Sequence, residues 1–351
     1  MIDWIRAKSL GYLYKAVRCF SKFFISRLAD IKKNQQDLES VIDFGDTVLD
    51  LIPFKSTLFK FPIPNKNKVS IYDLEFPSPF IVSSFKMHSS SLEMWSSIGA
   101  GAVIVKTILP DVSLGNPRPR IQEVDSSGQP HLLNAMGLPG PGVASFISTI
   151  QSWDWLKKLN RPVGISIGGH SSMDYFESIK KIESCSFDFS YFYELNISCP
   201  NTPDGANLSK HVDQLDVLLK DLRQLTNRVI SVKLSPAQTN KQIKRYGDLL
   251  SSYERMMVNV GNTRPTKRQD VGLSDLQFSR PVAGLSGPSL IERTREMVRE
   301  LKSVDVPIIA TGGISNLSDV YKLKTDGADL FGMATSLVFN PFIVVEFNKR
   351  F

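Results

Sequence analysis

The stretch PIIATGGISNLSDVYKLKTDGADLFGMATSLV, residues 307–338, contains a complete strand–helix–strand pattern. The apolar run at 307–313 ends in two glycines, a helix is expected to begin near Asn316, and a second apolar run follows at 330–335. Short buried strands joined by amphipathic helices are typical of parallel α/β sheets. The fold class then depends on how many such units the chain contains.

The same alternation extends back to residue 79. We predict strands at 79–84, 102–106, 162–167, 193–198, 229–234, 255–260, 307–313 and 330–335. Helical patterns lie between them, for example at 209–225 and 289–303, and the expected N-caps include Ser209, Ser289 and Asn316. Eight β-then-α units predict an α/β fold, a closed (β/α)₈ TIM barrel with an N-terminal helical extension. An open doubly wound sheet is the alternative, but the chain has no GxGxxG turn and no Walker loop.

Length and composition agree with one barrel plus additions. The chain has 351 residues, and 42% of them are hydrophobic, which is enough for a large core. Its three cysteines, Cys19, Cys185 and Cys199, are too few and too scattered for a disulfide framework. No CxxC pair indicates a zinc site, so we expect no metal and a reducing compartment.

The first 35 residues carry most of the net charge. They hold eight basic and two acidic residues, a net charge of +6 out of +7 for the whole chain. The nearly neutral remainder argues against a nucleic-acid-binding protein. We therefore divide the chain into a basic helical extension and linker at 1–68 and a barrel at 69–351.

An amphipathic helix is expected at 10–31. Its charged residues interrupt every apolar run well below the ~20 residues that a membrane span requires. They also argue against a secretory signal, whereas an organelle transit peptide remains an alternative. Two main alternatives remain: the helix packs its apolar stripe on the barrel, or it lies in the plane of a membrane with its lysines facing anionic headgroups. RNA binding is a minor third alternative. The stripe consists of Leu10, Leu13, Val17, Phe20, Phe24, Leu28 and Ile31.

Chemistry in such barrels collects at the carboxyl ends of the strands. Two lysines, several amides and one thiol at one rim fit an anionic ligand with many hydrogen-bonding edges, although each residue alone has a structural explanation as a solvated lysine or a turn-forming asparagine. Glycine-rich turns at 284–290 and 310–320, with the loop at 332–338, predict the site of a phosphorylated cofactor. The strand-end residues are Ser83, Ser84, Lys106, Ser166, Asn196, Cys199, Asn201, Lys233, Asn259, Gly312, Gly313 and Thr335.

At this point residues 70–340 resemble the dihydroorotate dehydrogenases, FMN-dependent barrels of pyrimidine synthesis. The resemblance rests on six motifs in order: GNPRPR (115–120), NAMGLPGPG (134–142), LNISCPNTP (195–203), VKLSP (232–236), GLSGPSL (284–290) and ATGGI (310–314). It implies oxidation of dihydroorotate to orotate in de novo UMP biosynthesis. A base removes the C5 proton while a hydride leaves C6 for the flavin N5.

The resemblance also implies residue roles. Cys199 is similar to the catalytic base of the family, and Lys106 to a lysine that serves both flavin and substrate. Substrate contacts are implied for Lys106, Asn134, Met136, Gly137, Leu138, Asn196, Asn201 and Asn259. FMN contacts are implied for Ser84, Lys106, Ser166, Asn196, Lys233, Ser286, Gly287, Gly312, Gly313, Ala334 and Thr335.

The chain mixes features of two branches of this family. Cys199, GNPRPR and NAMGLP resemble the soluble branch, whereas the N-terminal extension, GISIGG (164–169), PNTPDG and GLSGPSL lean toward the membrane-bound branch, which reduces quinone. After Asn259 a serine or threonine is expected, but Val260 stands there, so Asn262 is an alternative match to the substrate amide.

The branch assignment decides the expected partners. We expect a peripheral protein on the cytoplasmic side of a membrane, held there by residues 1–35, with quinone as electron acceptor. The alternatives are a soluble cytoplasmic enzyme that uses fumarate, a related dihydropyrimidine as substrate, or a non-catalytic barrel that binds FMN or phosphate. The oligomeric state stays open, with a homodimer as one alternative.

Overall fold

The computed structural model describes the backbone of residues 2–31, 38–126, 128–197 and 208–351, and the side chains of these residues except 26–31. At its centre eight parallel strands form a closed barrel in the order β3-β4-β7-β8-β9-β10-β13-β14. The strands are β3 (Phe80–Val82), β4 (Ala102–Ile108), β7 (Val163–Ile167), β8 (Tyr191–Leu195), β9 (Ile230–Leu234), β10 (Met256–Val260), β13 (Ile308–Thr311) and β14 (Leu330–Met333). All eight predicted strands are present, so the predicted TIM barrel is confirmed.

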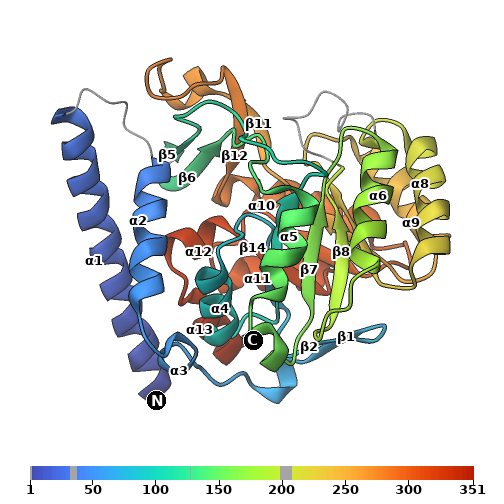
Figure 1. Ribbon diagram of the computed structural model, residues 1–351, viewed down its shortest axis with the longest axis horizontal. Helices are drawn as coiled ribbons and strands as arrows, with labels where there is room; N and C mark the ends of the chain where they lie inside the picture. The colour runs from blue at the N-terminus through green and yellow to red at the C-terminus, as the bar shows by residue number, and fades with distance from the viewer. Residues whose placement is uncertain (1, 32–37, 127, 198–207) are drawn as a thin grey trace.

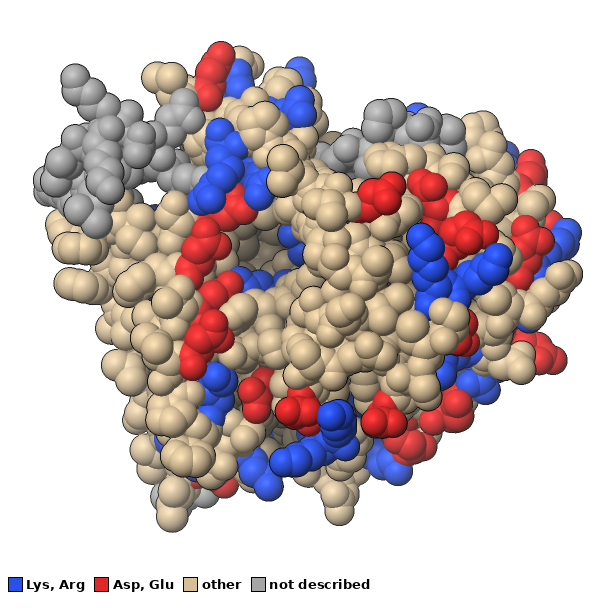
Figure 2. All heavy atoms as spheres, viewed as in Figure 1, with Lys and Arg blue, Asp and Glu red and all other residues tan. Residues whose placement is uncertain are grey.

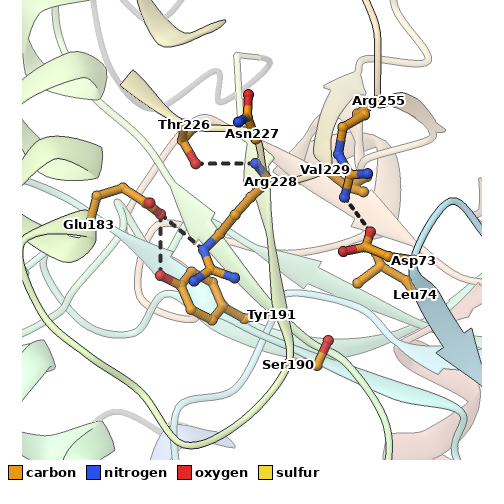
Figure 3. A pocket seen from close by; sticks show the side chains of 10 residues that line it. All are labelled: Asp73, Leu74, Glu183, Ser190, Tyr191, Thr226, Asn227, Arg228, Val229 and Arg255. Atoms are coloured by element: carbon orange, nitrogen blue, oxygen red, sulfur yellow. Dashed lines mark hydrogen bonds and ion pairs between the residues drawn. The ribbon is translucent and has the colours of Figure 1, made fainter. Parts of the chain in front are cut away.

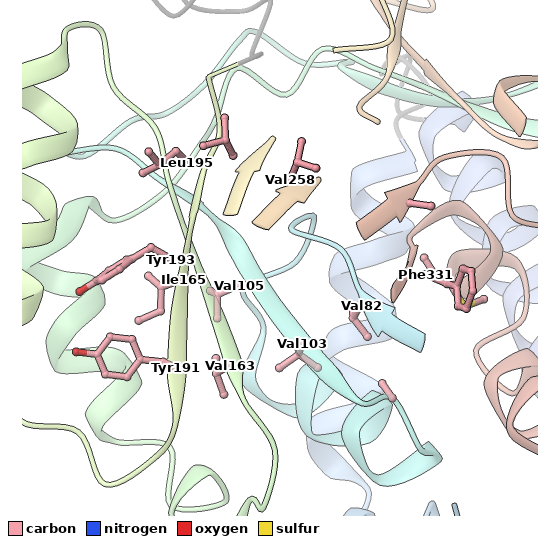
Figure 4. Packing of buried hydrophobic residues seen from close by; sticks show 14 of the residues in the cluster. Val82, Val103, Val105, Val163, Ile165, Tyr191, Tyr193, Leu195, Val258 and Phe331 are labelled. Carbon is pink, nitrogen blue, oxygen red and sulfur yellow. The ribbon is translucent and has the colours of Figure 1, made fainter. Parts of the chain in front are cut away.

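Helices follow the barrel strands and surround them on the outside (Figure 1). They are α4 (Ser89–Ile98), α5 (Gly142–Gln151), α6 (Ser172–Glu183), α8 (Val212–Leu225), α9 (Asn240–Ser251), α10 (Ile291–Leu301), α11 (Leu317–Asp326), α12 (Thr335–Phe339) and α13 (Ile343–Arg350). Their apolar faces bury the outward-pointing side chains of the strands in the main hydrophobic core. Figure 4 shows Tyr191 and Tyr193 of β8 among these side chains, directed away from the barrel.

One of three predicted helix caps is confirmed. The side chain of Asn316 accepts a hydrogen bond from the backbone N–H of Asp319, and the carboxylate of Asp319 accepts one in return, which forms a capping box at the start of α11. Ser209 and Ser289 do not cap helices, because α8 begins after His211 and α10 follows a 3₁₀ turn at Pro288–Leu290.

Different structures stand at the two ends of the barrel (Figure 1). At the amino-terminal end, the hairpin of β1 (Val69–Ile71) and β2 (Leu74–Phe76) packs apolar side chains onto the lowest inward-facing residues of the barrel. At the carboxyl end stands an antiparallel sheet in the order β11-β12-β6-β5. Its strands are β5 (Ile121–Ser126), β6 (Gln129–Asn134), β11 (Arg264–Lys267) and β12 (Val282–Ser286).

In the described part of the chain, three α-helices precede the barrel: α1 (Ile2–Ile31), α2 (Leu38–Leu51) and α3 (Lys55–Leu58). The long helix α1 lies beside α2 at one side of the molecule and also contacts α13 (Figure 1). Among the described residues, no helix is both long enough and apolar enough to cross a membrane.

The face of α1 that packs on the protein differs from most of the predicted apolar stripe. Ala7, Gly11 and Ser21 are buried, and the Tyr14 hydroxyl donates to the backbone oxygen of Val338 at 2.8 Å. Leu13, Val17, Phe20 and Phe24 of the predicted stripe are instead 46–69% exposed. Leu10 of the stripe packs against the main core, but these four residues do not, so the prediction that the stripe packs on the barrel is wrong for this part of the helix. The side chains of Leu28 and Ile31 lie outside the described residues.

The chain passes very close to itself where β10 ends. Gly261 has φ +130°, and a Cβ at this position would overlap the backbone oxygen of Thr311 at the end of β13. Gly272 also has a positive φ, +75°, but open space surrounds it.

We expect Gly261→Ala to lower the free energy of unfolding by about 2–4 kcal/mol, because overlap adds to backbone strain. Gly272→Ala is the matched control and should cost only about 1 kcal/mol, from the strain alone. Urea unfolding of both variants measures the difference, and equal losses would contradict the proposed close contact.

Candidate active site

The barrel interior is divided into an apolar and a polar layer. Side chains alternate along a strand, so residues two positions apart face the same side. Ile81, Ile104, Phe192, Met257, Ile309 and Leu330 form the apolar layer with the β1–β2 hairpin. Two positions further along the same strands stand Ser83, Lys106, Glu194, Asn259, Thr311 and Gly332. The polar groups therefore gather at the carboxyl end, where barrel enzymes place their chemistry.

Glu194 is the centre of this polar layer, and its side chain is completely buried. One oxygen, Oε1, accepts hydrogen bonds from the hydroxyls of Ser84 at 2.6 Å and Ser166 at 3.0 Å. The other, Oε2, accepts from the amide nitrogen of Asn259 at 2.6 Å. The Nζ of Lys233 lies 3.6 Å from Oε1 and donates to Ser84 Oγ at 3.0 Å.

A second branch of the network leads from Ser166 to Asn196. The hydroxyls of Ser166 and Thr107 are 2.9 Å apart, and the side-chain amide of Asn196 donates to Thr107 Oγ1 at 2.9 Å. The structure thus brings together five predicted site residues, namely Ser84, Ser166, Asn196, Lys233 and Asn259. Sequence reasoning missed the two residues that join them, Glu194 and Thr107. The signal for Glu194 was a carboxylate inside the otherwise apolar strand YFYEL (191–195).

Lys106 lies in the same layer, and among the described residues no hydrogen bond joins its side chain to the network. Its pKa is lowered to about 8, mainly by burial and further by the positive charge of Arg120, while Glu39 opposes the shift. Arg120 itself is buried and forms a two-pronged pair with the carboxylate of Glu39, at 2.7 and 2.9 Å. A lysine and an arginine near each other give this part of the site a positive potential.

The helix α2 supplies acidic side chains to the edge of the site. Glu39, Asp43, Asp46 and Asp50 recur every three or four residues, which places them on one face of the helix. Asp46 pairs with Lys86 and Asp50 accepts from Ser90 at 2.6 Å. Figure 2 shows a row of acidic residues over the position of α2, next to a hollow with basic atoms inside it.

The predicted phosphate residues come from three loops that meet at the carboxyl end. The hydroxyls of Ser286 and Thr335 are 2.9 Å apart, which joins the end of β12 to the start of α12, next to Gly287 and Ala334. The loop after β13 passes close to the start of α10, because a Cβ on Gly313 would overlap the backbone of Ile291. Gly312 and Gly313 both have positive φ, 120° and 84°. Such a loop can bring backbone N–H groups close to a phosphate.

The loop after β6 carries the next group of predicted residues. Asn134 ends β6, and its amide donates to the backbone oxygen of Gly284 at 3.4 Å. In the turn that follows, Met136 accepts from the backbone of Asn116 at 3.0 Å, and Gly137 and Leu138 have positive φ. The Leu138 side chain reaches Gly168, just beyond β7.

Two residues with predicted roles, Cys199 and Asn201, lie outside the described residues. Asn262, the alternative to Asn259, stands in a turn and accepts from the backbone of Thr263 at 2.8 Å, whereas Asn259 is fully buried in the polar layer. Within the described parts of the chain, no group of three or more histidine, cysteine or acidic side chains could hold a metal ion.

Three buried polar atoms of the upper layer have no hydrogen-bond partner among the described residues. They are Ser83 Oγ, Thr311 Oγ1 and Asn259 Oδ1. Because an unpaired buried polar group costs about 1–3 kcal/mol, such atoms require an explanation. A ligand with hydrogen-bonding edges at the carboxyl end would satisfy them.

A polar cavity of about 420 Å³ lies at the opposite end of the barrel (Figure 3). Its charged residues are paired with one another: Arg255 binds Asp73, and Glu183 accepts from Arg228 at 3.1 Å and from Tyr191 at 3.2 Å. The cation of Arg228 also stacks on the Tyr191 ring at 3.6 Å. Residues at this end of a barrel typically serve stability.

Comparison with known proteins identifies the family. The family model described as dihydroorotate dehydrogenase matches residues 66–350. The chain belongs to the dihydroorotate dehydrogenase family. This confirms the resemblance predicted from the motifs, and it makes the protein an enzyme, an oxidoreductase of the dihydroorotate dehydrogenase type.

Similar dihydroorotate dehydrogenases come from Malacoplasma penetrans, Bacillus pumilus and Eimeria tenella. The chain is 28% identical to the catalytic subunit of dihydroorotate dehydrogenase B (NAD(+)) from Malacoplasma penetrans, over 80% of this chain and 90% of that protein. It is 28% identical to the same subunit from Bacillus pumilus, over 79% and 88%. The crystal structure of the Eimeria tenella enzyme in complex with ferulenol has the same fold, with a TM-score of 0.72, 22% identity, and coverage of 87% and 88%.

The lowered pKa of Lys106 predicts a pH-dependent effect on the stability of this dihydroorotate dehydrogenase. At pH 7 we expect Lys106→Met to raise the free energy of unfolding by up to about 3 kcal/mol, because it removes a buried charge. This gain should be fully present below pH 8. It should disappear as the pH rises toward about 10.4, where lysine in the unfolded chain also loses its proton.

Urea unfolding at pH 7 and pH 10 measures this change. Lys180→Met on α6 is the control, because the Lys180 side chain is 57% exposed and should shift stability by less than about 0.5 kcal/mol at either pH. If Lys106→Met raised the free energy of unfolding equally at both pH values, the lowered pKa of Lys106 would be contradicted.

Proposed function

We propose that this chain oxidises dihydroorotate to orotate in de novo UMP biosynthesis, with FMN as its cofactor. The observation that carries the proposal is the polar layer above a closed apolar layer, in a chain of this family. It places two lysines, two asparagines and a glycine-rich cradle at one end of the barrel. An anionic ring with amide edges and a phosphorylated flavin both match this set of groups.

The residues present fit FMN. Ser83 and Thr311 carry unpaired buried hydroxyls in the polar layer, and the glycine loop after β13 leaves no room for side chains. When bound, FMN supplies the acceptor for a hydride. Ser84, Lys106, Ser166, Asn196 and Lys233 would hold its ring system, and Ser286, Gly287, Gly312, Gly313, Ala334 and Thr335 its ribityl chain and phosphate.

The remaining predicted residues would hold and deprotonate the substrate. Asn134, Met136, Gly137, Leu138, Asn196, Asn201 and Asn259 would bind the ring edges and the carboxylate, together with Lys106. Cys199 would act as the base that takes the C5 proton, while the hydride leaves C6. A free thiol has a pKa of about 8.5, so the base requires nearby positive charge, which Lys106 and Lys233 would provide.

The exposed face of α1 supports a peripheral membrane protein, and at a membrane the proposed electron acceptor is a quinone. Phe20 and Phe24 stack with ring centroids 6.2 Å apart and are 69% and 54% exposed. Lys8 and Lys15 are exposed on another side of the same helix. Aromatic rings on one side and lysines on another are typical of helices that lie in the interface of an anionic bilayer.

A soluble acceptor is the alternative. The bacterial relatives carry NAD(+) in their names, which favours testing NAD⁺ besides fumarate and quinone. In that case the protein would be a soluble cytoplasmic enzyme. It could then form a homodimer without any contact to a membrane.

Anaerobic reduction of the purified yellow protein by dihydroorotate tests substrate, cofactor and base together. We expect the flavin absorbance near 450 nm to bleach on mixing, and Cys199→Ala to slow this step by about 10²–10⁴-fold, the usual loss when a general base is removed. Cys185→Ala is the control, because Cys185 lies at the end of α6 away from the site and should bleach at the wild-type rate.

The reduced protein is then mixed with quinone, fumarate or NAD⁺. Rapid reoxidation by quinone alone supports the membrane-bound assignment, whereas fumarate or NAD⁺ would overturn it. A protein without bound flavin, or one that dihydroorotate does not reduce, would refute the proposed function.

Flotation with liposomes that contain anionic lipid tests the role of α1. We expect the wild-type protein to float and the double variant Phe20→Glu/Phe24→Glu to remain in the dense fractions, because two charges replace the apolar face. Leu276→Glu is the control, since Leu276 is 71% exposed on another part of the chain and should not alter flotation. Absence of wild-type flotation would contradict membrane binding.

A further inference from the structure

In every hydrogen bond around Glu194, the neighbouring residue is the donor and the carboxylate is the acceptor. An ionised carboxylate only accepts hydrogen bonds, so every polar neighbour must donate to it. Ser84 and Ser166 donate their hydroxyl hydrogens to Oε1, and the amide of Asn259 donates to Oε2. The nearby ammonium of Lys233 balances the negative charge, and this is the arrangement that allows a carboxylate to be fully buried.

This direction decides which way the Asn259 amide points. At 2.6 Å from Glu194 Oε2, only the NH₂ group of Asn259 can face the carboxylate, because two acceptors at that distance would repel each other. The carbonyl oxygen, Oδ1, must therefore point away from Glu194. It is buried and has no partner among the described residues, although Asn259 stands in the layer that faces the carboxyl end of the barrel.

The donor and acceptor roles of the other network residues follow from these hydrogen bonds to Glu194. Ser84 uses its hydrogen for Glu194 and so accepts from the Nζ of Lys233 at 3.0 Å. Ser166 likewise uses its hydrogen for Glu194, so at the 2.9 Å contact with Thr107 it is the acceptor. One carboxylate thus orients side chains from several strands without reaching the open end itself.

We propose that Glu194 is a positioning residue that fixes the Asn259 amide, so that its Oδ1 accepts a hydrogen bond from a ring N–H of the bound ligand. This inference deepens the proposed function and rests on it. Two ligands of the site have the required chemistry, because the dihydropyrimidine ring and the isoalloxazine ring both carry imide N–H groups. The unpaired acceptor selects rings with such a donor against rings that lack it.

The test exchanges the donor and the acceptor across the Glu194–Asn259 hydrogen bond. In Glu194→Gln, the side-chain oxygen still accepts from Ser84 and Ser166, and the new NH₂ group faces the NH₂ group of Asn259. These two donors repel each other. The Asn259 amide must then rotate, so that it presents a donor to the ligand instead of an acceptor. In Asn259→Asp, two carboxylates face each other. In the double variant, the new amide at position 194 donates to the new carboxylate at position 259, whose second oxygen again presents an acceptor to the ligand.

Two dissociation constants are measured for each variant. Flavin fluorescence quenching gives the affinity of the apoprotein for FMN, and the flavin absorbance change gives the affinity of the yellow protein for orotate. We expect each single variant to weaken at least one of them by about 5- to 150-fold, because a buried group loses its partner. The double variant should recover that same constant to within about threefold of wild type. The constant that responds identifies which of the two rings binds Asn259.

Glu183→Gln is the matched control. Glu183 also accepts from several donors, including the Tyr193 hydroxyl at 2.6 Å and the Arg228 guanidinium at 3.1 Å, but it lies at the opposite end of the barrel. Its loss should lower the melting temperature and leave both dissociation constants unchanged. Far-UV circular dichroism checks the folding of every variant. Asn259→Ser, which removes Oδ1 and keeps Glu194, replaces Glu194→Gln if the latter does not fold.

The outcomes separate this inference from the proposed function. A wild-type protein that binds neither FMN nor orotate refutes the function. A wild-type protein that binds both, with single variants that bind equally well, overturns only the role of Glu194. A double variant that binds no better than the weaker single variant also overturns it, because the restored donor and acceptor would then not restore binding.

Discussion

Closure of the parallel barrel is the constraint on which the rest of the structure depends. In a closed barrel every second residue of each strand points to the same interior, so eight strand ends converge at one end. The apolar layer around Phe192 and Met257 fills the lower interior and excludes water. The polar side chains above it must therefore hydrogen-bond with one another or with a ligand. The polar network around Glu194 is the consequence, and Asn259 Oδ1 is the atom of this network that has no partner among the described residues.

Burial of charge explains the electrostatics of this site. A buried ion is tolerated when an opposite charge and hydrogen bonds compensate for lost hydration. Glu194 has Lys233 and three further donors, and Arg120 has the carboxylate of Glu39. The pKa of Lys106 is lowered mainly because the side chain is buried and further because Arg120 is a nearby cation. The positive potential left in the site favours an anionic substrate.

The N-terminal helices are attached to the barrel by two different interactions. Acidic residues of α2 pair with basic residues next to the site, such as Lys86 and Arg120. The helix α1 contacts the body through small residues and through Arg18 and Lys22, which both pair with Glu123 on β5. These polar attachments leave the apolar side of α1 on the surface. The helices thus connect the edge of the active site with an exposed apolar face.

The sequence by itself determined the barrel and the end at which its chemistry lies. Eight apolar runs of strand length are a local property, and so are the polar residues that end them, for example Lys233 after ISV and Asn259 after MMV. The glycine turn at 312–313 was equally visible, because only glycine tolerates such a backbone in close contact. These features depend on neighbours in the sequence alone.

Only the tertiary structure decided how these residues work together. Glu194 appeared as one polar residue in a buried strand, and its role depends on Ser84, Ser166 and Asn259, which are 28–110 positions away. The buried face of α1 stayed open in the sequence for a similar reason. Hydrophobicity identifies the most apolar side of a helix, whereas the side that packs is chosen by the shape and charge of its partner, here Val338 and Glu123. Contacts between distant parts of the chain are formed by folding, so no local pattern could reveal them.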